Sequence, residues 1–143
     1  MKIAVLGGGN GSFAAAGDFA LAGHEVRLWR RNPGDVEAHR AQGGTITVID
    51  RVGRRDIRLA MVTSSIAEAI DAADLILCPA PAFAQAAIAD LAAPHLRDGQ
   101  VVFLPPGTFG SYIFARAAKD AGNRAELFQG QTSHDRSSSA TAP

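Results

Sequence analysis

Short apolar runs alternate with longer amphipathic segments along most of this chain. The apolar runs, each bounded by glycine, proline or polar residues, predict buried strands at residues 3–6, 25–30, 75–78 and 100–104. Apolar positions at helical spacing predict helices at residues 10–22, 33–42, 83–93 and 109–121. Strands that alternate with helices of this length are joined by right-handed crossovers and form a mostly parallel, doubly wound sheet. The pattern therefore predicts an α/β fold.

Two segments depart from this alternation. Residues 45–52 and 55–63 are rich in β-branched residues and predict an inserted β-hairpin, with Gly53-Arg54 as its turn. A short helix is expected from Ser65 to Ala73, because Glu68 is spaced to form a capping box with Ser65.

The end of the chain changes in composition. A last strand is expected at residues 124–128, which would complete a single domain over residues 1–128. Residues 129–143 contain no large apolar side chain and cannot contribute to a core, so we expect a disordered polar tail there.

Composition excludes several functions. The 14 basic and 14 acidic residues balance, so the chain lacks the excess positive charge that binding to nucleic acid or to an anionic membrane requires. A single cysteine, Cys78, cannot form an internal disulfide, and no Cys/His spacing predicts a metal site. We expect a cytoplasmic protein, since the sequence shows neither a signal peptide nor an apolar run of the roughly 20 residues that span a bilayer.

The turn after the first predicted strand carries the candidate chemistry. It has the pattern Gly-x-Gly-x-x-Ser between a strand and a helix, the context in which such a turn binds a dinucleotide pyrophosphate. Gly7 allows the tight turn, Gly9 allows the phosphates to approach the backbone, and Ser12 is small enough for close packing of helix and strand. The backbone N–H groups expected to face the phosphates belong to Asn10, Gly11, Ser12 and Phe13. These features predict a Rossmann-type dinucleotide-binding fold.

Other interpretations of this turn are weaker. A methyltransferase loop usually has an acidic residue directly before it, where this chain has Leu6. A flavin site requires an acid at the end of the second strand, and that acid is missing. The turn could also be purely structural, as in an α/β domain that binds no ligand.

The end of the second strand bears on the choice of cofactor. An NAD site usually has Asp or Glu here for the ribose 2′-hydroxyl, but this chain has Arg30 and Arg31, with no carboxylate before Asp35. Arginine binds phosphate bidentately and can stack on adenine. The pair favours NADP, with NAD as the alternative if both arginines are ordinary solvated charges.

Residues 2–12 and 21–29 resemble the N-terminal domain of the octopine/nopaline (opine) dehydrogenase family, and are similar also to NAD(P)-dependent glycerol-3-phosphate dehydrogenase and ketopantoate reductase. The Gly9-Asn10-Gly11 run is most like the opine enzymes. The resemblance implies an NAD(P)-dependent oxidoreductase, a dehydrogenase that transfers hydride between NAD(P)H and an imine or keto substrate. Residues 73–83 match the family's fourth-strand segment, whose following loop runs along the ribose and nicotinamide. This role would fall on Cys78, Pro79, Ala80 and Phe83, although the prolines could simply end the strand.

The resemblance covers about residues 1–125. It implies that the catalytic histidine and its carboxylate partner belong to a C-terminal helical domain, which we expect to be absent from this fragment. The histidines of this chain are His24, His39, His95 and His134, and none has a carboxylate partner that is well placed by sequence. We therefore predict no catalytic residue in this chain.

We therefore expect the chain to bind cofactor alone and to meet a small-molecule substrate only with a further domain. Apolar surface left uncovered along residues 109–121 would promote association, for example as a homodimer. The alternative function is a stand-alone dinucleotide-binding or sensing module without catalysis.

Overall fold

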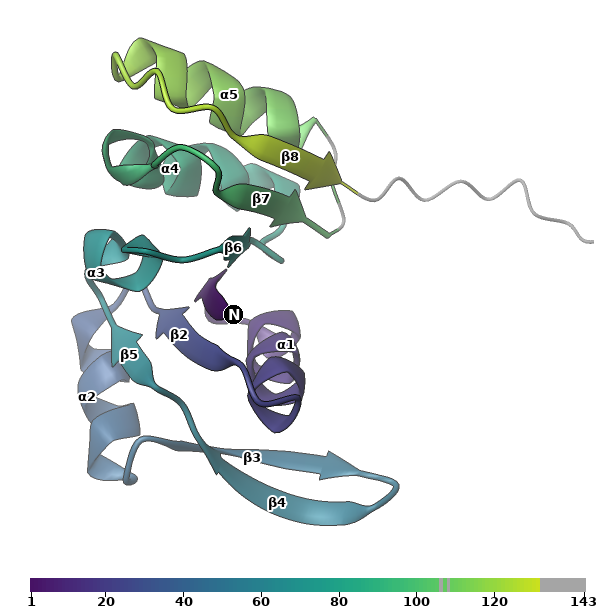
Figure 1. The fold of residues 1–143 in the computed structure, drawn as a ribbon. Coiled ribbons are helices and arrows are strands. Elements are labelled where there is room, and N and C mark those ends of the chain that lie inside the picture. The colour runs from purple at the N-terminus through teal and green to yellow at the C-terminus, as the bar shows by residue number, and fades with distance from the viewer. Residues whose placement is uncertain (106, 108, 132–143) are drawn as a thin grey trace, which may run out of the picture.

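A six-stranded parallel sheet forms the centre of the molecule in the computed structural model, which describes residues 1–105, 107 and 109–131 (Figure 1). The strands lie in the order β5-β2-β1-β6-β7-β8, and every pairing is parallel. In chain order they are β1 (Lys2–Leu6), β2 (Glu25–Trp29), β5 (Met61–Thr63), β6 (Leu75–Leu77), β7 (Val101–Leu104) and β8 (Phe128–Gln131). The sequence-based prediction of a doubly wound parallel sheet is confirmed.

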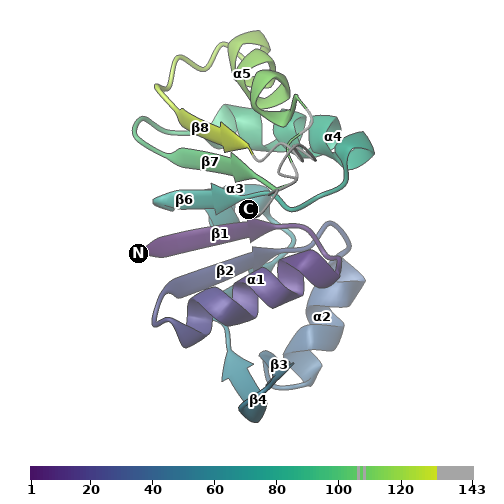
Figure 2. The same ribbon diagram turned by 90° about the vertical axis from the view of Figure 1, so that its right-hand side faces the viewer.

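Helices cover both faces of the sheet (Figure 2). They are α1 (Asn10–Leu21), α2 (Pro33–Ala41), α3 (Ile66–Ile70), α4 (Ala82–Ala92), a 3-10 turn at Ala93–His95, and α5 (Gly110–Asp120). The alternation of β1 separates the two cores: Ala4 and Leu6 belong to a cluster with residues of α3, α4 and α5, whereas Ile3 and Val5 belong to a second cluster with residues of α1 and α2.

The strand order reverses between β1 and β6, the two central strands. The chain winds outward from β1 through β2 to β5, then returns to the other side of β1 and winds outward again through β7 to β8. At such a reversal the loops that follow the two central strands diverge to opposite faces, which leaves a crevice at the carboxyl ends of the strands where α/β proteins bind ligands. Here those loops are the glycine turn after β1 and the segment that begins at Cys78.

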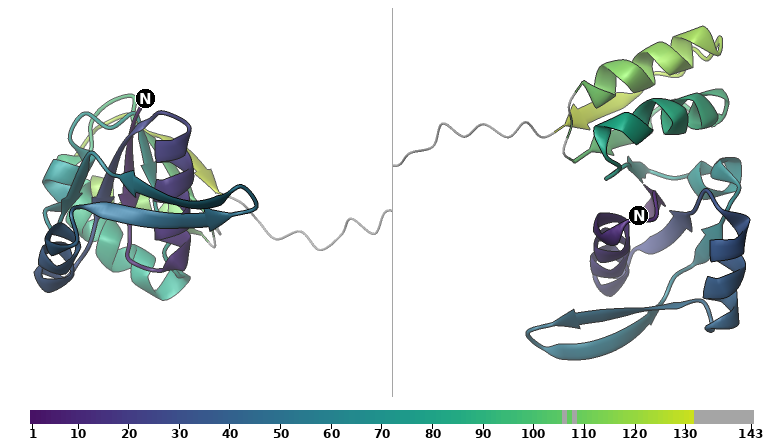
Figure 3. Two further views of the ribbon diagram at one scale, coloured as in Figure 1. Left: turned by 90° about the horizontal axis from the view of Figure 1, so that it is seen from below. Right: turned by 180° about the vertical axis from the view of Figure 1, so that it is seen from behind.

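The inserted hairpin is formed by β3 (Thr45–Asp50) and β4 (Gly53–Arg58), which pair from Thr45↔Arg58 to Asp50↔Gly53 (Figure 3). Its turn is therefore Arg51-Val52, and the expected turn at Gly53-Arg54 is wrong. The expected single strand 55–63 is also divided. The N–H of Ala60 donates to the carbonyl of Val26 (3.0 Å), which directs the chain from the hairpin into β5 beside β2.

The helix after β5 is shorter than expected, because it ends at Ile70 and Ala72 adopts a left-handed backbone conformation (φ 53°). Only half of the expected capping box forms. Ser65 Oγ accepts from the N–H of Glu68 (3.3 Å), but the Glu68 carboxylate accepts from the hydroxyl of Thr63 instead (2.6 Å). That hydroxyl in turn accepts from the N–H of Ser65 (3.0 Å).

The last strand begins later than predicted. Asn123 donates to the carbonyls of Ala93 and Leu96 (2.8 Å each), and the N–H of Glu126 donates to Asp98 (2.8 Å). These bonds hold residues 123–126 outside the sheet, so pairing with β7 starts at Phe128 and extends to Gln131. The expected last strand is present, but its bounds are wrong: of residues 124–128 only Phe128 belongs to β8, and residues 129–131 of the expected tail belong to it as well. Residues 132–143 lie outside the described part.

Candidate functional site

The glycine turn leaves β1 through a backbone conformation that only glycine adopts easily. Gly7 has φ 144° and donates its N–H to the carbonyl of Trp29 on the neighbouring strand (3.2 Å). A Cβ at Gly7 would lie 2.6 Å from Ser12 Oγ, and Ser12 itself is buried between helix and strand. Both the turn and the close packing predicted from Gly7 and Ser12 are thus present in the structure.

Helix α1 begins directly after this turn with an open N-terminus. Gly9 is its N-cap in an extended conformation (φ −86°, ψ 176°), and no side chain caps it. The N–H groups of Ser12 and Phe13 both donate to the carbonyl of Gly9 (3.0 and 3.2 Å). The first helical turn thus uses both of these groups, and the expectation that they face a ligand stays a prediction. No carbonyl of the described residues accepts from Asn10 or Gly11, whose N–H groups remain available.

A cleft of about 280 Å³ lies above the glycine turn and has two chemically different walls. Its floor is Gly7, Gly8, Gly9 and Ser12. The polar wall comes from the end of β2 and the start of α2, and the apolar wall comes from the loop after β6 and the first turns of α4. The polar wall contains Arg30, Arg31, Asn32 and Asp35 beside Trp29, and the apolar wall contains Pro79, Ala80, Pro81, Ala84 and Ile88.

Arg30 is held in place by three neighbours. Its Nη2 lies 2.7 Å from Asp35 Oδ2, and its Cζ lies 5.0 Å from the ring centroid of Phe13. A Cβ at Gly8 would lie only 2.5 Å from Arg30 Nε, so the guanidinium rests directly on the backbone of the glycine turn. Arg31, by contrast, is exposed and makes no ion pair within the described part of the chain.

The structure places the four predicted residues after β6 in different environments. Pro79 and Ala80 line the cleft, and a Cβ at Gly11 would lie 3.8 Å from Pro79 Cβ across it. Cys78 is fully buried, and this burial raises the pKa of its thiol from 9.0 to about 11. Phe83 is 88% exposed and does not line the cleft. Ligand contacts by Cys78, Pro79, Ala80 and Phe83 stay predictions.

The lining includes residues that the sequence alone did not single out. Pro81, Ala84 and Ile88 follow helical spacing and present one apolar stripe to the cleft, a pattern visible in the sequence. The sequence indicates Asp35 only as the first carboxylate after the arginines. Its place beside Arg30 depends on Asn32, whose side chain accepts from the N–H of Gly34 (2.9 Å) and starts α2 at this point.

A larger cleft of about 700 Å³ lies between α1 and the hairpin and includes His39. It lacks the glycine floor and the open helix terminus of the smaller cleft. Among the described residues there is no cluster of His, Cys, Asp or Glu that could bind a metal ion. Within the same residues, no helix has the length and apolar character needed to cross a bilayer. His24 and His95 lie outside both clefts, and His134 lies outside the described part.

Comparison with known proteins agrees with this architecture. The family model described as ketopantoate reductase PanE/ApbA matches residues 3–141. Opine dehydrogenase of Arthrobacter sp. (strain 1C) is 33% identical over 134 residues, covering 91% of this chain and 36% of that protein. Glycerol-3-phosphate dehydrogenase [NAD(P)+] of Nitratidesulfovibrio vulgaris (strain DP4) is 33% identical over 102 residues, covering 71% of this chain and 30% of that protein.

Among solved structures, octopine dehydrogenase with NADH and pyruvate superposes with a TM-score of 0.74 at 26% identity, over 89% of this chain and 35% of that one. The chain thus spans about a third of the length of these relatives and corresponds to their N-terminal part. Fold, glycine turn and family model agree, and the chain belongs to the ketopantoate reductase PanE/ApbA family.

Proposed function

We propose that this chain binds NAD(P)(H) at its glycine turn, as the cofactor-binding domain of an oxidoreductase similar to opine dehydrogenase. The observation that carries the proposal is the uncapped N-terminus of α1, which opens onto a two-walled cleft where the strand order reverses. Turns of this kind bind a pyrophosphate because the free N–H groups and the positive end of the helix dipole both favour an anion.

The residues of the cleft fit the parts of a dinucleotide. The N–H groups of Asn10 and Gly11 would bind the pyrophosphate, and Gly9 would allow it to approach, since a Cβ there meets only open space. The flat adenine would lie against the apolar wall, where Ala84 and Ile88 offer a surface without charge. The adenosine ribose would then face the polar wall. The bound cofactor would supply the hydride, while the chain orients it.

The preference that we propose is for NADP. An exposed guanidinium at Arg31, without a partner in the described part of the chain, suits a 2′-phosphate. Arg30 lies beside it on the same wall but is paired with Asp35. NAD binding remains the alternative, because Asp35 could accept a hydrogen bond from a ribose 2′-hydroxyl.

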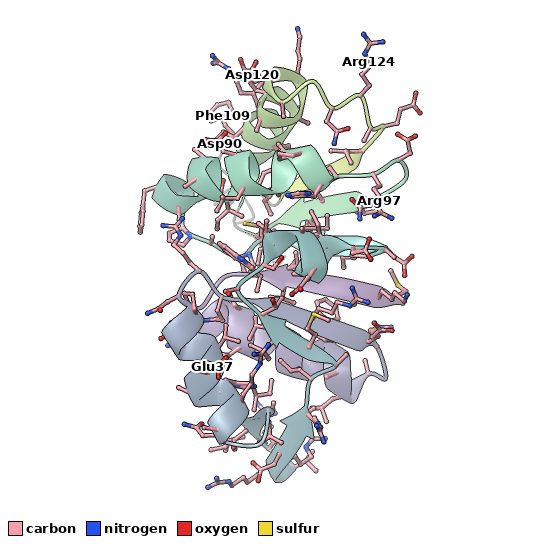
Figure 4. All side chains as sticks on the ribbon, turned by 90° about the vertical axis from the view of Figure 1, so that its left-hand side faces the viewer. Glu37, Asp90, Arg97, Phe109, Asp120 and Arg124 are labelled. Atoms are coloured by element: carbon pink, nitrogen blue, oxygen red, sulfur yellow. The ribbon has the colours of Figure 1, made fainter. Side chains whose placement is uncertain are left out.

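Catalysis is proposed for the complete enzyme alone. There, hydride would pass between NAD(P)H and an imine or keto substrate, with catalytic groups from a further domain. Phe109 is 74% exposed and Tyr112 64% exposed at the start of α5, near the carboxyl ends of the strands (Figure 4). We propose that a further domain or a second copy covers this surface.

A titration of the intact chain with NADPH and NADH tests the proposal. Trp29, the only tryptophan, is buried beside the cleft, so its fluorescence should report binding. We expect saturable quenching by both cofactors, tighter for NADPH, and no turnover of 2-oxo acid and amino acid. Absence of binding to either cofactor at millimolar concentration, confirmed by calorimetry, would refute the proposal. Tighter binding of NADH would refute only the NADP preference.

A further inference from the structure

Asp35 occupies a position that its sequence context does not explain. Its carboxylate lies on the polar wall of the cleft, in the first turn of α2, and is 44% exposed. Its contact is Arg30 Nη2 at 2.7 Å, and the Arg30 side chain is 19% exposed. An acidic side chain therefore stands in the part of the cleft where the two arginines would attract an anion.

The position of Arg30 shows what this carboxylate does in the free protein. The guanidinium lies against the backbone of the turn: its Nε is 2.5 Å from where a Gly8 Cβ would be, in space that a side chain there would fill. The ring of Phe13 supports the guanidinium at 5.0 Å. Arg30 is thus fixed against the turn with one of its nitrogens committed to Asp35, and its positive charge is balanced locally.

We propose that Asp35 is a specificity-determining residue that restrains Arg30 and limits the preference for a 2′-phosphorylated dinucleotide. This inference rests on the proposed dinucleotide function. With Asp35 ionised, Arg31 is the cation free to meet a 2′-phosphate, and the carboxylate repels that dianion. Without the charge at position 35, Arg30 can turn toward the phosphate and add a second bidentate contact.

The expected effect is moderate because the pair is partly exposed. An ion pair of this kind favours the paired position of its arginine by a factor of up to about five in population. Removing a carboxylate charge at this range from a phosphate raises the affinity for the phosphate by a similar factor in a partly screened site. The Asp35→Asn variant should therefore raise the ratio of NADPH affinity to NADH affinity about tenfold, with NADH affinity changed little.

Three variants test the proposal in the full chain, by calorimetric titration with NADPH and NADH. Asp35→Asn should raise the affinity ratio. The double variant Arg30→Met/Asp35→Asn should lose the part of that gain that acts through Arg30 and keep only the part due to the removed repulsion. The matched control is Glu37→Gln on the same helix (Figure 4), where the carboxylate pairs with Arg40 (3.0 Å) and does not line the cleft. This control should leave the ratio unchanged.

Several outcomes would overturn the proposal: an unchanged ratio in Asp35→Asn, a parallel loss for both cofactors, or a gain that persists in full without Arg30. A second measurement separates this failure from failure of the dinucleotide function. In the ligand-free chain, the side-chain Nε–H NMR signal of Arg30 should be sharp and slow to exchange, and it should broaden in Asp35→Asn. If neither cofactor binds the wild type but this signal behaves as expected, Asp35 restrains Arg30 and the proposed function fails. If the Arg30 signal is the same in the wild type and in Asp35→Asn, Asp35 does not restrain Arg30 and the proposal fails.

Discussion

Replacing Gly9 by alanine separates binding from folding at this turn. Gly9 has φ −86°, which alanine adopts freely, and a Cβ would meet no atom within 4 Å. Alanine is a poorer N-cap than glycine, but it loses less backbone entropy on folding, so the free energy of unfolding should change by no more than about 1 kcal/mol. In the complex, the added methyl would occupy space needed by the pyrophosphate. Loss of one charge-assisted hydrogen bond costs about 2 kcal/mol, or roughly thirtyfold in Kd.

The assay pairs a thermal melt with a cofactor titration of the same protein. Gly9→Ala should melt within about 4 °C of the wild type, while its Kd for NADPH and NADH rises by roughly thirtyfold for both. The equal effect is expected because the two cofactors share the pyrophosphate. Unchanged affinity in a folded variant would refute the placement of the pyrophosphate at this turn. A large loss of stability would show instead that the space beside Gly9 is not open.

Three further experiments test the fold around the site. Gln100→Leu should lower the free energy of unfolding by about 2–4 kcal/mol in chemical denaturation, because the buried Gln100 amide donates to two backbone carbonyls (2.9 and 3.0 Å) that leucine leaves unpaired; an effect below 1 kcal/mol would contradict these bonds. Gly17→Ala should cost about 1–3 kcal/mol, since its Cβ would overlap Val48 of the hairpin, and Val48→Ala should restore most of the loss. Failure of the rescue would mean that the hairpin does not pack on α1. Cys78, with a pKa of about 11 against 9.0, should be alkylated at pH 8 at least a hundredfold more slowly in the native than in the urea-unfolded chain, and equal rates would contradict its burial.

The sheet could be predicted because each strand is marked by a pattern of neighbouring residues in the sequence. Each central strand is a short apolar run ended by glycine or proline, and the alternation of strands with helices allows few topologies. The hairpin and the last strand could be predicted only in part. The hairpin packs through Val48 against Gly17 of α1, and the start of β8 depends on the bonds from Asn123 to residues 30 and 27 positions earlier in the chain. Such long-range contacts have no signature in a local pattern.

The candidate site, like the fold, could be predicted from the sequence only in part. Gly7 and Ser12 could be placed from spacing alone, since both serve a turn formed by consecutive residues. The pairing of Arg30 with Asp35 could not, because it needs the exact direction in which α2 leaves β2. The hydrogen bond from the Ser12 N–H to the carbonyl of Gly9 could not be predicted either, because residue spacing does not show how tightly the first helical turn is wound. The contacts of each side chain therefore come from the structure, while ligand binding at this turn stays a prediction.

A crystal structure of the chain grown with NADPH would test the central claim most directly. The account predicts pyrophosphate oxygens within hydrogen-bond distance of the N–H groups of Asn10 and Gly11, with the adenine against Ala84 and Ile88. Density for the cofactor in the cleft between α1 and the hairpin, or a glycine turn left free of phosphate at saturating NADPH, would contradict it.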